Sequence, residues 1–455
     1  MLTLLAFVWP PILVKAGQLI LSFSILVVLH ELGHFLPAKW FGCRVEKFYL
    51  FFNPWFSLFK KKVGETEYGL GWVPFGGYVK ISGMIDESMD KEQMGKPAEP
   101  WEFRSKPAWQ RLIIMLGGVT VNVILAIIIF IGITWKWGDE YLPPQNARYG
   151  LAVDSLGRAV GLQDGDIVTK INGNPVKDEM KVPMQIATQE AKHITVLRNG
   201  AEQQLPIPES LIPALNSSRG GDFAFVRVPG YVDELSSEKE YSAEKAGLRK
   251  GDRIVGIDTV ETPYYQDFMR TIVNYKGRTV PLRIERAGQP MTLQMPVNKD
   301  GRIGIKVVTD MEKLGFKTEV KEYTFAESIP MGFTRCWNTL KMYMTGLRQL
   351  FTGKAKVQDS LGSIFSFGSV FPGQWDWQSF WTLTAFFSII LAFMNILPIP
   401  ALDGGHALFT LYEMITGRKP GEKFMEYAQI VGMVLLLGLM ALALGLDVWR
   451  YFFKK

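Results

Sequence analysis

Four long apolar segments constrain this chain more than any other feature of its sequence. The clearest runs from Leu112 to Thr134 and has 23 residues without a charge and one strongly polar side chain, Asn122. A helix needs about 20 predominantly apolar residues to cross the hydrocarbon core of a bilayer. Further uncharged segments are Tyr427–Leu446, Phe380–Leu397 and, at the N-terminus, Ala16–Leu29. The sequence therefore predicts four transmembrane helices, at about 12–38, 112–134, 378–400 and 427–446.

Loop charges predict how these helices cross the membrane, because Lys and Arg concentrate in cytoplasmic loops. Residues 39–62 carry six basic residues and one acid, and residues 418–423 add three basic residues. We therefore expect both loops in the cytoplasm, and both termini and residues 135–379 outside it. Basic residues at the C-terminus favour the opposite orientation of the chain in the membrane. The first segment lacks a basic n-region and a small-residue cleavage site, so we expect a retained helix and not a signal peptide.

Composition narrows the class of protein further. A mean hydropathy of +0.09, with 48% hydrophobic and 21% charged residues, is too apolar for a disordered chain and too charged for an all-membrane bundle. The two cysteines, Cys43 and Cys336, exclude a disulfide framework and a CxxC site. The net charge of +6 comes with no continuous basic face, so we expect no nucleic-acid partner.

The segment between the second and third apolar segments contains an internal repeat. The pattern Gly161-Leu-x-x-Gly-Asp166 recurs 86 residues later as Gly247-Leu-x-x-Gly-Asp252, and each copy continues with alternating apolar residues. A Gly-Asp turn before such a run is typical of a short β-strand. The pattern resembles PDZ domains of bacterial proteases, which bind an extended chain end at a sheet edge. The alternative is two small β-rich domains with a packing role.

These observations predict a polytopic α-helical membrane protein with two inserted β-rich, PDZ-like domains. The first half of its membrane domain is residues 1–135. The PDZ-like domains are residues 136–220 and 222–310. Residues 311–376 form a linker region whose helical stretch at 324–351 lies on the membrane surface, packs beside the spans or only connects. The second half of the membrane domain is residues 377–455.

His30-Glu31-Leu-Gly-His34 is an HExxH pattern at the end of the first apolar segment. Residues four apart on a helix lie about 40° apart around its axis, so both imidazoles can bind one metal ion. Glu31 lies about 100° away from His30 and can take a proton from a water that zinc activates. Three ionisable side chains in one turn of a membrane helix cost several kcal/mol unless they are paired or bind a metal.

A catalytic zinc ion needs a third protein ligand and an open position. Beyond His30 and His34 the chain has only His193 and His406, and we expect His193 to be a surface or core residue of the first PDZ-like domain. Asp403 follows the third apolar segment beside helix-breaking prolines, and His406 lies three residues later. Spacing alone leaves Asp403 and His406 as rival ligands.

The HExxH pattern together with Asn395-Ile-Leu-Pro-Ile-Pro-Ala-Leu-Asp403-Gly resembles the signature of the site-2 protease family of intramembrane zinc metalloproteases. The tandem PDZ-like insertion resembles the bacterial sigma-E regulator branch of that family. The resemblance implies one zinc ion held by His30, His34 and Asp403, with Glu31 as the base. It also implies that Asn395 holds the substrate or its transition-state oxygen.

The family also has a glycine-rich loop that reaches the active site, and residues 63–82, with Gly76 and Gly77, match it. Such a loop could pair with an unwound substrate, whereas the plain alternative is a turn of a cytoplasmic hairpin. Two places depart from the family pattern. Gly118-Val-Thr-Val-Asn122 lacks a common proline, and Leu361-Gly-Ser-Ile replaces a common Gly-Pro-Ile; neither bears on the zinc ligands.

The resemblance predicts a multi-pass protein of the bacterial inner membrane, with periplasmic PDZ-like domains and an active site near the cytoplasmic side. Its substrates would be single-span membrane proteins of the anti-sigma-factor type, already cut by a site-1-type protease, and possible remnant signal peptides. Two other classes compete: a PDZ-bearing membrane adaptor with a non-proteolytic metal site, and an ion-translocating protein. The complete HExxH pattern disfavours the first, and four unrelated apolar segments disfavour a repeat-built transporter.

Overall fold

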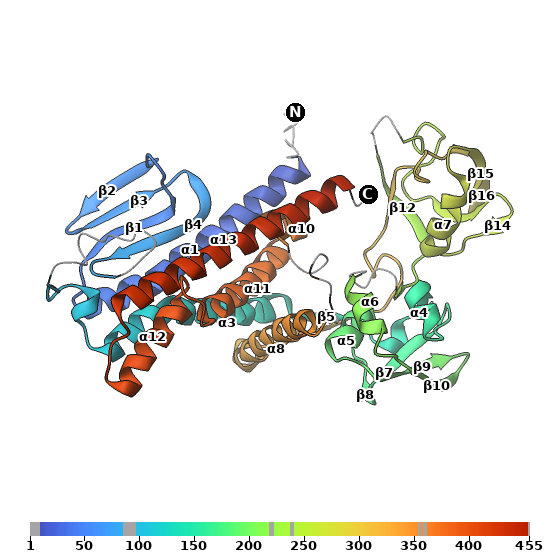
Figure 1. The fold of residues 1–455 in the computed structure, drawn as a ribbon. Coiled ribbons are helices and arrows are strands. Elements are labelled where there is room, and N and C mark those ends of the chain that lie inside the picture. Colours follow the sequence, from blue (N-terminus) through green and yellow to red (C-terminus); the bar gives the residue numbers. More distant parts are fainter. Residues whose placement is uncertain are drawn as a thin grey trace. The chain divides into compact units, whose positions relative to one another are not determined.

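The structure is a computed structural model that describes residues 10–84, 97–217, 223–236, 241–353, 355, 357 and 362–453. The chain forms two compact units (Figure 1). Unit 1 comprises Met1–Gly138, Glu322–Leu347 and Leu361–Lys455, and unit 2 comprises Asp139–Lys321 and Arg348–Ser360. Unit 1 contains the predicted membrane segments, and unit 2 contains most of the segment inserted between them.

Within the described residues, four helices of unit 1 are long and apolar enough to cross a membrane, which confirms the four apolar segments as candidate spans. They are α1 (Pro11–Trp40), α3 (Ala108–Trp137), α11 (Trp377–Ile396) and α13 (Glu422–Phe453). The third ends at Ile396, short of the predicted residue 400, because Pro398 disfavours a helical conformation at Leu397. The unit also contains α8 (Phe325–Phe351) as far as Leu347, α10 (Ile364–Val370), α12 (Asp403–Thr416) and the short helix η1 (Phe103–Ser105).

Helix α3 packs against α1, α11 and α12. Its contact with α1 is a contact of backbones, made at Gly33 and Gly117. A Cβ atom added to Gly33 would lie 2.4 Å from the carbonyl oxygen of Gly117, and one added to Gly117 would lie 1.9 Å from that of Gly33. Small residues allow such close helix crossings, so these glycines fix how α3 meets the HExxH turn of α1.

Residues 45–81 form a four-stranded sheet in the order β2-β3-β1-β4. Its strands are β1 (Val45–Phe52), β2 (Phe59–Val63), β3 (Thr66–Leu70) and β4 (Val73–Ile81). The segment expected to be a glycine-rich loop is therefore largely strand, because β1 provides hydrogen-bonding partners that local composition does not reveal. Strand β4 lies at an edge of the sheet and packs against α1.

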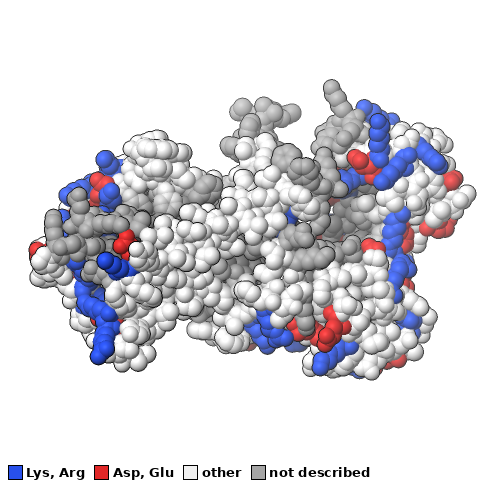
Figure 2. Space-filling model, viewed as in Figure 1, with Lys and Arg blue, Asp and Glu red and all other residues white. Residues whose placement is uncertain are grey.

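The surface of unit 1 has little charge along its helices. In Figure 2 the part of the surface over these helices is mostly white, whereas Lys and Arg gather at the end that carries the β1–β4 sheet and α12. Many large apolar side chains on the helices are exposed, including Ile128 on α3 and Val434 and Leu435 on α13. Exposed apolar surface of this extent is typical of a contact with lipid.

Unit 2 consists of short strands and helices around two hydrophobic cores. Module A has its core in residues 142–228 and 314–316, and module B has its core in residues 232–303. The strands of module A are β6 (Leu151–Val153), β7 (Ile167–Ile171), β8 (Asn174–Pro175), β9 (His193–Arg198), β10 (Ala201–Pro206) and β11 (Ala224–Val226). Those of module B are β12 (Gly230–Leu235), β13 (Arg253–Ile257), β14 (Val260–Glu261), β15 (Thr279–Arg286), β16 (Gln289–Pro296) and β17 (Ile305–Val307).

Short elements complete unit 2. Strands β5 (Asp139–Tyr141) and β18 (Glu319–Lys321) pair with each other. The helices are α4 (Ser155–Ala159), α5 (Val182–Thr188), α6 (Leu211–Ser217) and α7 (Tyr265–Ile272), with the single-turn helices η2 (Pro144–Asn146), η3 (Glu179–Lys181) and η4 (Val273–Tyr275).

The two Gly-Asp turns of the sequence pattern make matching contacts. In module A, the buried Asp166 accepts hydrogen bonds from Nε and Nη2 of Arg198, at 2.8 and 2.6 Å. In module B, the buried Asp252 accepts hydrogen bonds from Nε and Nη2 of Arg286, at 2.7 and 2.8 Å. Each arginine comes from a hairpin strand and also donates to the carbonyl of the first glycine in its pattern.

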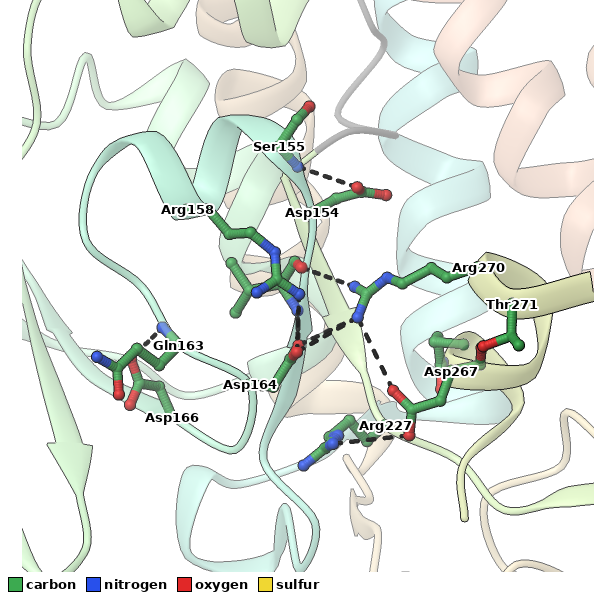
Figure 3. A network of polar contacts seen from close by, with 12 residues as sticks. Asp154, Ser155, Arg158, Gln163, Asp164, Asp166, Arg227, Asp267, Arg270 and Thr271 are labelled. Carbon is green, nitrogen blue, oxygen red and sulfur yellow. Dashed lines mark hydrogen bonds and ion pairs between the residues drawn. The ribbon is translucent and has the colours of Figure 1, made fainter. Parts of the chain in front are cut away.

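Modules A and B are joined by a polar network, which Figure 3 shows. Arg270 of α7 donates from Nη2 to the carbonyl oxygen of Val153, at 2.7 Å, and its Nη1 lies 3.3 Å from Oδ1 of Asp164. Arg158 pairs with the same aspartate at 2.8 Å. Burial alone raises the pKa of Asp164, but the Val153 amide and the two guanidinium groups hold it below its usual value.

Candidate active site

The HExxH residues lie in the C-terminal half of α1. His30 and His34 are buried, and their rings meet edge to face with centroids 4.9 Å apart. Their Nε2 atoms lie 3.3 Å apart. The helix therefore brings two imidazole nitrogens to one point, as the spacing of the pattern predicts.

Helix α3 fixes the orientation of both rings. Nδ1 of His34 lies 2.8 Å from the carbonyl oxygen of Ile114, so the ring donates there and leaves Nε2 with its lone pair. Nδ1 of His30 lies 3.1 Å from the side-chain amide of Asn122, which is fully buried. The amide atom beside Nδ1 of His30 is Nδ2 of Asn122, and Oδ1 has no partner. Rotating the amide by 180° would bring Oδ1 to Nδ1, which would then donate, and the ring of His30 would also present an unprotonated Nε2. Such partners on the second ring nitrogen are typical of metal-binding histidines.

Asp403, the first residue of α12, completes the group. Its Oδ2 atom lies 3.3 Å from Nε2 of both His30 and His34. Oδ2 is buried, and its geometry to the two rings does not make a hydrogen bond. The three potential ligand atoms lie within 4.8 Å of one another, so among the described residues they form a group that could hold a metal ion. Two imidazoles and a carboxylate are a donor set that zinc accepts.

Glu31 and strand β4 line the same cavity, which has a volume of about 150 Å³. Gly77 and Val79 of β4 belong to its wall, and a Cβ atom added to Gly77 would lie 2.6 Å from Cγ1 of Val27 in α1. Gly76 does not line this cavity; its φ of +89° requires glycine and accompanies an irregularity in the pairing with β1. Nδ2 of Asn395, at the end of α11, lies 3.2 Å from Nε2 of His30.

The remaining histidines are not part of this group. His406 lies one turn along α12 and lines the cavity, but the group of converging ligand atoms in the described residues contains Asp403 instead. His193 is the first residue of β9 in module A. The geometry therefore favours Asp403 as the third ligand.

The sequence pattern of peptidase family M50 matches residues 18–439. The chain belongs to peptidase family M50. This confirms the resemblance to site-2 proteases, and the chain is a zinc metalloprotease. Of the three classes that the sequence left open, this finding supports the protease.

Relatives match this M50 chain along almost its whole length. It is 30% identical to the "Putative zinc metalloprotease NMA0084" of Neisseria meningitidis, over 95% of this chain and 98% of the relative. It is 28% identical to the "Regulator of sigma-E protease RseP" of Escherichia coli, over 98% of this chain and 100% of the relative. A "Regulator of sigma E protease" of Haemophilus influenzae is 27% identical, over 98% of this chain and 100% of the relative.

Three residues that support the M50 site were not predicted from the sequence. Asn122 was visible as the polar residue of an uncharged run, but its partner was not. Gly118 leaves space for both rings, since a Cβ atom there would lie 2.4 Å from Nε2 of His34 and 2.6 Å from Cε1 of His30. Gln429 of α13 also lines the cavity, and one polar residue in an apolar helix was its only signal.

Proposed function

We propose that this M50 protease hydrolyses peptide bonds within transmembrane segments, at a site formed by His30, Glu31, His34 and Asp403. The observation that carries the proposal is the convergence of Nε2 of both histidines with Oδ2 of Asp403 among helices long enough to cross a membrane. A buried carboxylate oxygen without a hydrogen bond is costly at membrane depth. A divalent cation relieves that cost.

One zinc ion per chain fits this group, with His30, His34 and Asp403 as its ligands. When bound, zinc polarises a peptide carbonyl and lowers the pKa of a water molecule toward neutrality. Glu31 lines the same cavity and takes the proton of the attacking water, then returns it to the leaving amine. The side-chain amide of Asn395 lies beside His30, where it can donate to the oxygen that becomes negative in the transition state.

Substrate is expected to bind along β4. A transmembrane helix hides its amides in internal hydrogen bonds, so it must unwind before it can be cut. Strand β4 is a sheet edge, and its Gly77 and Val79 line the cavity. An unwound segment that pairs with this edge as an added strand would keep its backbone groups satisfied next to Glu31.

Water can reach the site through a larger cavity of about 410 Å³ in unit 1. It shares Met84, His406 and Gln429 with the site cavity, and Arg104 and Lys419 lie in its wall. These basic residues belong to the segments that we assign to the cytoplasm. The active site would then lie near the cytoplasmic side of a bacterial inner membrane.

The substrates that we propose are single-span membrane proteins of the anti-sigma-factor type, cut first by a site-1-type protease, and remnant signal peptides. The sigma-E regulator proteases among the relatives support the first class. Residues 136–220 and 222–310 are proposed as periplasmic PDZ-like domains that exclude uncut substrates or bind trimmed ends. The matched Gly-Asp turns support this, as does a cavity of about 570 Å³ lined by Leu235 and Phe268 in module B.

The test compares wild type with Glu31→Gln, both purified as full chains. We expect equal zinc content in both and cleavage of a single-span substrate by wild type alone. Asp403→Asn serves as the ligand control and should lose both zinc and cleavage. Equal cleavage by wild type and Glu31→Gln would refute the role of Glu31, and full zinc binding by Asp403→Asn would refute the ligand set.

A further inference from the structure

The turn before Asp403 is in contact with a residue of α13. Asp403 follows the turn 397–402, which joins α11 to α12. Within this turn Ala401 has a φ of +80°, a left-handed conformation that costs an alanine energy. A strained residue two positions before a ligand persists only where its surroundings hold it.

The surroundings of Ala401 include a side chain from α13. The backbone N–H of Ala401 donates to Oε1 of Gln429, at 3.2 Å. Gln429 is 5% exposed and lines the cavity beside Ala401, Leu402 and Asp403. Its amide therefore accepts a hydrogen bond from the strained residue itself, inside the site.

One turn further along α13, Gly432 makes a second contact with the same segment. A Cβ atom added there would lie 1.8 Å from the carbonyl oxygen of Pro400 and 2.4 Å from its carbonyl carbon. Residues three apart share one face of a helix, so Gln429 and Gly432 form one contact surface. The backbone of α13 thus packs directly on the residue that precedes Ala401.

Helix α13 otherwise contributes little to the packing of unit 1. In an apolar stretch of 18 residues of α13, 11% of the residues are buried, compared with 39% in the corresponding stretches of α3 and α11. Gln429 is thus a buried polar residue on a largely exposed helix. Packing of the helix as a whole does not explain it, whereas the turn before Asp403 does.

We propose that Gln429 is a positioning residue for Asp403, which it holds in the ligand position through the left-handed turn at Ala401, with Gly432 allowing the contact. This inference rests on the proposed function only in that Asp403 is a metal ligand. Loss of the Gln429 acceptor lets Ala401 relax toward a negative φ, and the carboxylate then moves away from His30 and His34. Groups that orient a metal ligand typically change metal affinity by about 10- to 100-fold.

The experiment measures zinc affinity by competition with a chelator, in the full chain carrying Glu31→Gln, so that proteolysis plays no part. Gln429→Leu should lower the affinity by about 10- to 100-fold. Adding Ala401→Gly should restore most of it, because glycine adopts a positive φ without strain. Cobalt substitution gives a second readout, since the visible spectrum of bound Co²⁺ should change in Gln429→Leu and return toward the parent in the double variant.

Matched variants separate positioning from a general effect on the membrane helices. Gln18→Leu removes another buried glutamine that donates to a backbone carbonyl, that of Pro372 at 2.8 Å, and should leave zinc affinity unchanged. Gly432→Ala should lower the affinity, whereas Gly438→Ala on the same helix, with nothing within 4 Å of the added Cβ, should not. If Gln429→Leu does not fold, Gly432→Ala tests the same turn.

Parent-like affinity in both Gln429→Leu and Gly432→Ala would overturn the inference, as would a loss that Ala401→Gly leaves unrestored. Asp403→Asn distinguishes this from failure of the proposed function. If Asp403→Asn binds zinc like its parent, the ligand set is wrong. If it loses zinc while Gln429→Leu keeps it, the ligand set stands and only the positioning role is refuted.

Discussion

Glu179 of module A is a buried acid outside the active site, and its replacement by glutamine should change how the stability of this module depends on pH. The residue is 1% exposed, and its Oε1 atom accepts a hydrogen bond from the backbone N–H of Val168, at 2.8 Å. Oε2 is buried without a hydrogen-bond partner in the described residues. Burial raises the pKa of Glu179 to about 8. The hydrogen bond from Val168 opposes this shift, and the charge of Asp178 adds to it.

The sign and size of the effect follow from that pKa. In the unfolded chain the pKa of Glu179 has its ordinary value of 4.5, so between pH 4.5 and about 8 the folded module binds more protons. The free energy of unfolding therefore falls as pH rises through this window, by about 1.4 kcal/mol per pH unit. Between pH 6 and pH 8 the loss is about 2.3 kcal/mol, or about 50-fold in the opening equilibrium, because the slope halves as pH reaches the folded pKa.

Hydrogen exchange of peptides that cover β7 reports this opening, because the amide of Val168 bonds to the carboxyl group itself. Wild type and Glu179→Gln are compared at the same pH, so that the intrinsic exchange rates cancel. We expect the protection of wild type, relative to the variant, to fall by about 50-fold from pH 6 to pH 8. Glu202→Gln, an exposed acid on β10, is the control. An equal pH response in wild type and Glu179→Gln would refute the reasoning.

Two further predictions concern the active site and the junction of the modules. Gly118→Ala should abolish zinc binding and proteolysis, because its Cβ atom would occupy the space of both imidazoles, whereas Gly132→Ala on the same helix, with nothing within 4 Å, should preserve both. Arg270→Ala removes contacts to Val153 and Asp164 and should broaden the distance distribution between spin labels placed in modules A and B; an unchanged distribution would show that the network does not couple them.

The parts of the site that the sequence predicts are those whose geometry is local. One helical turn brings His30 and His34 together in any α-helix, so their spacing was sufficient. Asp403 and His406 could not be separated by spacing, because the choice depends on where α12 begins. The structure begins that helix at Asp403, after a turn that contains the left-handed Ala401.

The parts that the sequence did not predict depend on contacts between distant segments. Asn122 stood out as a polar residue in an apolar run, but its contact with His30 exists because Gly33 and Gly117 let α1 and α3 cross at backbone distance. The sheet of residues 45–81 was missed for a related reason. Its glycines suggest a loop, and only the pairing of β1 with β3 and β4 makes them part of strands.

The groups that support the metal ligands are all neutral, and this follows from the position of the site among apolar helices. With both imidazoles neutral, the charges of Asp403 and Glu31 balance one divalent cation, so any further acid would leave a net charge that costs several kcal/mol at membrane depth. Amides lie close to the ligands without that cost: Asn122 on α3, Asn395 on α11 and Gln429 on α13. Each of the other three apolar helices thus gives uncharged contacts, α3 and α11 to the histidines of α1, and α13 to the turn before Asp403. The metal site is a property of the helices together, and a change that displaces any one of them reaches the ligands directly.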